Sequence, residues 1–123
     1  NLPVVLLVLS VCLVMTFLTE LTSNTATTQM ALPVLASVAV AVNINPLLLM
    51  LPATLSASCA FMLPVATPPN AIIFGTERIT IREMARAGLV LNLAGAIVIT
   101  TMVYLLGGLA FGCDMTVIPE WIN

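Results

Sequence analysis

The chain lacks two residue types on which much protein chemistry depends. None of its 123 residues is a histidine, and its three basic residues, Arg78, Arg82 and Arg86, leave no lysine. A Ser/His or Cys/His dyad, a lysine Schiff base and a histidine metal site are therefore excluded. Three arginines are also too few to neutralise a nucleic-acid backbone. We expect neither an enzyme nor a nucleic-acid partner.

Charge of either sign is scarce. Only 7% of the residues are charged, 61% are hydrophobic, and the mean hydropathy is +1.21. No charged residue lies between positions 21 and 76. This composition excludes a soluble domain and is typical of a chain that crosses a bilayer several times. We expect an all-α, multi-pass integral membrane protein, in the plasma membrane or the bacterial inner membrane.

Cysteine is sparse as well. Cys12, Cys59 and Cys113 lie far apart and mostly within apolar runs. Cysteines in such runs behave as small buried hydrophobes, so no disulfide framework is indicated.

Residues 1–43 form the first expected unit, a helical hairpin. Two apolar arms, Leu2–Leu18 and Met30–Val42, flank the polar stretch Thr19–Gln29. The first arm would be about 26 Å long as a helix, slightly shorter than the hydrocarbon core. Either both arms span fully and the polar stretch is a surface loop, or the hairpin is re-entrant and its tip lies among other protein segments. We favour the re-entrant hairpin.

Residues 44–76 form the second unit, a discontinuous transmembrane helix. A turn that ends in Pro46 precedes an expected helix over Leu47–Leu63. The three prolines within Pro64–Asn70 should interrupt it, and Ala71–Gly75 resumes the apolar pattern. One unbroken helix over Pro46–Thr76 would be about 46 Å long, too long for the core.

The remaining units follow from charge. Arg78, Arg82 and Arg86 are spaced four apart, which predicts one face of a short amphipathic helix over 77–86. Basic residues beside a span favour the cytoplasm. Residues 87–113 are then the final transmembrane helix, with Asn92 and Tyr104 as packing groups. Residues 114–123 are an external tail, with Trp121 at the interface.

Two polar interruptions in this apolar chain predict a binding site. Ser23-Asn24-Thr25 lies at the hairpin tip, and Ala66-Thr67-Pro68-Pro69-Asn70 lies at the break. These residues could merely cap or kink helices. However, broken backbone at membrane depth is tolerated only where it is buried in protein or lines an aqueous cavity. Free carbonyl and hydroxyl oxygens suit an alkali cation, and half-helix N-termini suit an anion. Since no basic residue is near, the pattern favours cation-coupled symport.

The residues of the two motifs, 20–26 and 59–75, strongly resemble the C-terminal half of divalent anion/sodium symporters. The resemblance implies one half of an inverted-repeat transporter in which each repeat has a re-entrant hairpin and a broken helix. It also implies that the N-terminal repeat is missing here, so that the chain is a fragment, and that the full-length protein is a homodimer. No cofactor is implied besides sodium as the coupling ion.

The resemblance further implies a role for each site residue. The sodium ligands would be Thr19, Thr22, Asn24, Ala66 and Pro68. The substrate, a small divalent anion, would contact Asn24, Thr25 and Thr67. Ser23, Glu20, Pro69 and Asn70 would support the site, with Glu20 as the single acidic candidate within the membrane.

The expected function is sodium-coupled uptake of a divalent organic anion such as a dicarboxylate or citrate. The alternatives are a sodium-independent anion exchanger and a non-transporting membrane scaffold protein. Uptake with sodium replaced by choline would separate these three. The sequence does not distinguish succinate, citrate and sulfate as substrates.

Overall fold

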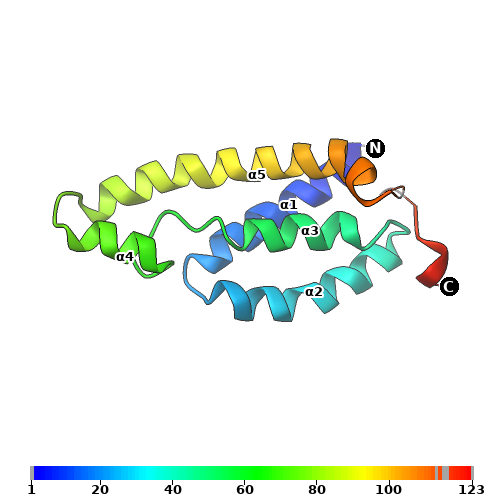
Figure 1. Ribbon diagram of the computed structural model, residues 1–123, viewed down its shortest axis with the longest axis horizontal. Coiled ribbons are helices and arrows are strands. Elements are labelled where there is room, and N and C mark those ends of the chain that lie inside the picture. The colour runs from blue at the N-terminus through cyan, green and yellow to red at the C-terminus, as the bar shows by residue number, and fades with distance from the viewer. Residues whose placement is uncertain (1, 113, 115–116, 123) are drawn as a thin grey trace.

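The computed structural model describes residues 2–112, 114 and 117–122. In this part the chain is helical and contains no strand, which confirms the predicted all-α fold class. Figure 1 shows α1, α2, α3 and α5 packed along one another, with α4 beyond the ends of α1, α2 and α3 and near the start of α5. The helices are α1 (Leu2–Thr19), α2 (Asn24–Ala41), α3 (Leu47–Ser56), α4 (Pro68–Gly75) and α5 (Ile81–Phe111), followed by the short 3-10 helix η1 (Glu120–Ile122).

Two of these helices, α1 and α5, are long and apolar enough to cross a membrane. At 1.5 Å per residue they are about 27 Å and 46 Å long, against a hydrocarbon core of roughly 30 Å. Only 28% of the apolar window of α1 and 22% of that of α5 are buried. Most of their apolar surface therefore faces outward, as expected for segments that contact lipid or further protein.

The hairpin turn is shorter than the sequence predicts. Only residues 20–23 lie between α1 and α2. Ser23 has extended backbone angles (φ −63°, ψ 126°), and its hydroxyl accepts a hydrogen bond from the amide of Ala26. This N-cap satisfies a free amide, so α2 begins at Asn24 rather than after the polar stretch. Between the two arms lies an apolar cavity of about 500 Å³.

The interruption of the second unit begins earlier than expected. The sequence predicts a helix as far as Leu63, whereas α3 ends at Ser56 and residues 57–67 are not helical. The amides of residues 61–63 bond to side chains of other elements instead of to carbonyls four residues earlier. The helix therefore ends before the prolines, and tertiary contacts satisfy the amides of residues 61–63 that follow it.

The segment 77–86 is not a separate amphipathic helix. Thr80 caps α5 and forms a capping box with Glu83, so the helix begins at Ile81 and runs unbroken to Phe111. Arg82 and Arg86 lie within its first turns, whereas Arg78 lies in the preceding turn, outside the helix. The three arginines thus do not share one helical face. Gly112 ends the helix with a left-handed conformation (φ 62°), which glycine adopts without strain.

Two expectations near the C-terminus lie outside the described residues. These are the boundary of the final span at Cys113 and the interfacial side chain of Trp121. Cys12 is buried, as predicted, and Cys59 is partly buried.

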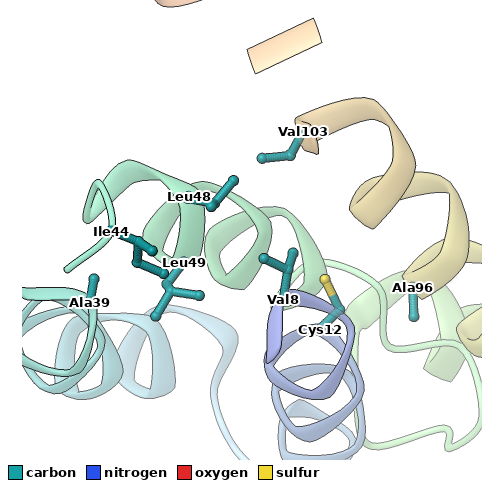
Figure 2. Packing of buried hydrophobic residues seen from close by; sticks show 8 residues of the cluster. All are labelled: Val8, Cys12, Ala39, Ile44, Leu48, Leu49, Ala96 and Val103. Atoms are coloured by element: carbon teal, nitrogen blue, oxygen red, sulfur yellow. The ribbon is translucent and has the colours of Figure 1, made fainter. Parts of the chain in front are cut away.

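The main core lies where α1, α3 and α5 meet, with a contribution from the end of α2. Figure 2 shows Val8 and Cys12 of α1 near Leu48 of α3 and Ala96 of α5. Leu48 and its neighbour Leu49 are fully buried. Because α3 packs against α1, α2 and α5, this helix is held from three sides.

Candidate functional site

Two threonine hydroxyls at the hairpin tip already donate their protons to hydrogen bonds within the protein. Thr19 is fully buried, and its hydroxyl donates to the carbonyl of Thr16 at 3.0 Å. The hydroxyl of Thr22 lies 2.7 Å from both the carbonyl of Leu18 and the hydroxyl of Thr27. A hydroxyl that donates to a carbonyl keeps lone pairs free to accept. Both threonines can therefore offer oxygen atoms to a donor or a cation.

Asn24 carries an acceptor without a partner. It is the first residue of α2, and its Oδ1 atom is buried with no hydrogen bond. The hydroxyl oxygen of Ser56, at the end of α3, is in the same situation. An unpaired buried acceptor costs about 1–3 kcal/mol, so such an atom is normally met by water or by a ligand.

Asn24 and Thr25 line a cavity of about 260 Å³ between the start of α2 and the end of α3. The wall opposite them is formed by Thr54, Ala57 and Ser58. The first amides of α2 also begin here, and a helix N-terminus carries a partial positive charge. The cavity thus combines oxygen ligands with a weakly positive helix end.

The other half-helix, α4, begins with a similar arrangement. Thr67 is its N-cap, with the hydroxyl accepting from the amide of Asn70 at 3.4 Å. Pro68 and Pro69 occupy the first two helical positions, where a missing amide costs nothing. The side-chain amide of Asn70 donates to the carbonyls of Ala60 and Leu63, at 2.9 and 3.0 Å. Asn70 therefore ties the start of α4 back onto the unwound segment.

Glu20 joins the tip to the unwound segment. Its carboxylate is 3% exposed and accepts from the backbone amides of Met62 and Leu63, at 3.0–3.2 Å. It also accepts from the side-chain amide of Asn92 at 2.7 Å. The tip of one unit and the break of the other thus share a single acidic side chain.

Sequence reasoning missed two residues of this cluster, Asn92 and Gly88, both on α5. Asn92 is fully buried and bonds to Glu20 and to the amide of Phe61. Gly88 lies against the backbone of Phe61 and Met62, where an added Cβ would come within 2.3 Å of a carbonyl oxygen. The available signal was that Asn92 is the one side-chain amide in the uncharged run 87–112.

The predicted ligands are brought together only in part. Asn24 and Thr25 share one cavity, and Glu20 and Asn70 both bond to residues 60–63. Among the residues described, no hydrogen bond joins Thr19, Thr22 or Asn24 to Ala66, Thr67 or Pro68. A common sodium site for these residues therefore stays a prediction.

Comparisons with known proteins match nearly the whole chain. Residues 2–112 match the model of the family described as the sodium:sulfate symporter transmembrane region. The chain is 54% identical over 110 residues to a protein of Staphylococcus saprophyticus named sodium-dependent dicarboxylate transporter SdcS, covering 89% of this chain and 21% of that protein. It is 55% identical over 97 residues to the SdcS protein of Staphylococcus aureus strain MRSA252, covering 79% of this chain and 19% of that protein. The chain thus spans about a fifth of the length of these relatives.

Proposed function

This chain belongs to the sodium:sulfate symporter transmembrane family, and on that premise we propose that it is the C-terminal part of a sodium-coupled dicarboxylate transporter. Membership of a transporter family makes it an integral membrane protein and not an enzyme. The two relatives described above carry names that specify sodium and a dicarboxylate, which supports the same pair of ligands here.

The observation that carries the proposal is the buried, unpaired Oδ1 atom of Asn24. Side-chain amide and threonine hydroxyl oxygens are hard ligands, and such ligands suit a cation that is not a transition metal. We propose that Asn24, Thr19 and Thr22 bind sodium, together with backbone oxygens of Ala66 and Pro68.

The anion would bind where the two half-helices begin. The N-terminus of α2 offers backbone amides at Asn24 and Thr25 and a positive dipole end. The helix α4 begins with Pro68 and Pro69, which have no amide hydrogen, so it would contribute its positive dipole end beside Thr67. No arginine lies within either segment, so within this chain a dicarboxylate would be balanced by these dipoles and by bound sodium. This requirement is the physical reason for coupling the two ligands.

The same proposal includes the architecture of the whole transporter. The position of Glu20 supports a re-entrant hairpin, since this acidic side chain at the tip is 3% exposed and bonds to Met62 and Leu63 rather than lying in a solvated surface loop. A second repeat of inverted topology would supply the other hairpin and enclose the site at mid-membrane. We propose that this repeat precedes the present chain and that the full-length protein is a dimer.

The test is uptake by the full-length transporter in proteoliposomes. Radiolabelled succinate should accumulate with external sodium and not with choline. Asn24→Ala should raise the half-saturating sodium concentration and the substrate KM together, because linked ligands lower each other's binding cost equally. Ser37→Ala is the matched control, since Ser37 is an exposed residue of α2 bonded only within its own helix. Equal uptake in sodium and choline would contradict the proposal.

A further inference from the structure

The hydrogen bonds of Glu20 leave neither carboxylate oxygen free. Oε1 accepts from Met62 at 3.0 Å and from the side chain of Asn92 at 2.7 Å. Oε2 accepts from Met62 at 3.2 Å and from Leu63 at 3.1 Å. Each partner is a neutral amide, and hydrogen bonds to a charged acceptor are about twice as strong as neutral ones. The carboxylate therefore fixes two consecutive backbone amides of the unwound segment.

The opposite side of that segment is fixed by α5. Asn92 uses both ends of its side-chain amide, donating to Glu20 and accepting from the amide of Phe61 at 3.3 Å. One turn earlier, Gly88 lets the helix backbone approach that of Phe61, at a distance no Cβ would permit. Three consecutive residues, 61–63, are thus held between the hairpin tip and α5.

The contacts between Glu20 and residues 61–63 connect both halves of the proposed site. Glu20 directly follows Thr19 and precedes Asn24 by four residues. Leu63 precedes Thr67 by four residues, and its carbonyl accepts from Asn70 in the first turn of α4. A displacement of residues 61–63 relative to Glu20 therefore moves the start of α4 relative to the tip.

We propose that Glu20, Asn92 and Gly88 are positioning residues that set the distance between the sodium ligands of the tip and the anion-binding start of α4. This inference rests on the proposed function and goes beyond it, because none of the three residues needs to touch either ligand. Coupling between two sites requires a physical element that both sites bias. The clamped segment 61–63 is that element.

The alternative is a cluster that only stabilises the fold. Loss of a purely stabilising contact reduces the amount of folded protein and leaves the affinities of the surviving molecules unchanged. Loss of a positioning contact changes the half-saturating sodium concentration per folded molecule. Sodium titration and backbone hydrogen exchange together separate the two roles.

The experiment uses the purified full-length protein with Glu20→Gln, Asn92→Leu and the double variant. Thr101→Ala is the control, an exposed residue of α5 bonded only to Ile97. We expect each single variant to raise the half-saturating sodium concentration for succinate uptake about fivefold or more. The double variant should add little, since both residues act through one network. The amides of residues 61–63 should exchange faster in all three variants and normally in the control.

Several results would overturn the proposal. One is unchanged exchange at residues 61–63 in Glu20→Gln, and another is a normal sodium titration for folded Glu20→Gln and Asn92→Leu. If Glu20→Gln does not fold, Asn92→Leu decides the matter, because it removes only one of the bonds to Glu20. Should wild-type uptake be independent of sodium, the proposed function fails, while the exchange measurement still decides whether these residues hold the segment.

Discussion

Replacement of Gly88 by alanine tests how closely α5 approaches the unwound segment. The added Cβ would lie 2.3 Å from the carbonyl oxygen of Phe61 and 2.5 Å from the Cα atom of Met62. Both obstructing atoms belong to the backbone, so neither can rotate away as the end of a side chain could. To reach ordinary contact the helix and the segment must separate by about 1 Å, in an interior that is already close-packed.

Gly95 provides the matched control on the same helix. Its added Cβ would meet only the sulfur of Cys59, at 3.8 Å, which is ordinary contact. Alanine is favoured over glycine within a helix by about 1 kcal/mol, and this gain is common to both variants. The difference between them therefore isolates the cost of overpacking, about 1–3 kcal/mol. We expect Gly88→Ala to be less stable than Gly95→Ala by that amount.

Thermal unfolding of the purified full-length protein, in one detergent and at one scan rate, measures this difference. The midpoint of Gly95→Ala should equal or exceed that of the wild type, and the midpoint of Gly88→Ala should lie below that of Gly95→Ala. Equal midpoints for the two variants would refute the close approach, because the helix-propensity gain cancels between them.

Two further predictions concern the break and the tip. Asn70→Asp replaces the donor to the carbonyls of Ala60 and Leu63 by an acceptor, so the initial rate of succinate uptake should fall about tenfold or more, with Thr76→Ala as an exposed control; near-normal uptake would show that Asn70 does not hold the break. A cysteine placed at Ser23 in a cysteine-free full-length protein should react slowly with a membrane-impermeant maleimide and be protected by sodium with succinate. Rapid labelling that neither ligand affects would favour a surface loop over a re-entrant tip.

Features that depend on neighbouring residues could be predicted from the sequence. The presence of a hairpin and of a later interruption follows from polar and proline-rich stretches within apolar runs. The capping box Thr80-Ile81-Arg82-Glu83 is also a local signal, and it marks the start of the last helix correctly. The charge pattern alone predicts a separate helix over 77–86, which is wrong because the capped helix runs unbroken from Ile81 to Phe111.

The end of α3 could not be predicted in this way. No glycine or proline lies between Ser56 and Leu63 to mark the end of the helix. The contacts that replace the helical bonds of residues 61–63 come from Glu20 and Asn92, distant in the sequence. Ser23 and Asn24 can be recognised because they belong to a contiguous motif. Asn92 stands alone in an apolar run, so the sequence predicts only a packing group there. A single amide in an apolar helix carries no local sign of its partner.

The buried face of α5 determines the angle at which α1 packs against it. Its buried positions Met84, Gly88, Asn92, Ala96 and Thr100 recur every four residues. Such a row is inclined by about 26° to the helix axis, so a helix that packs along it crosses α5 at an angle. In Figure 1, α1 runs obliquely beneath α5 in this manner. The two helices contact one another at Cys12 and Thr100, whose side chains are 3.5 Å apart. Residues 61–63 lie between Glu20, which directly follows α1, and Asn92 of α5. Any change in the angle between the two helices therefore alters the space that residues 61–63 occupy.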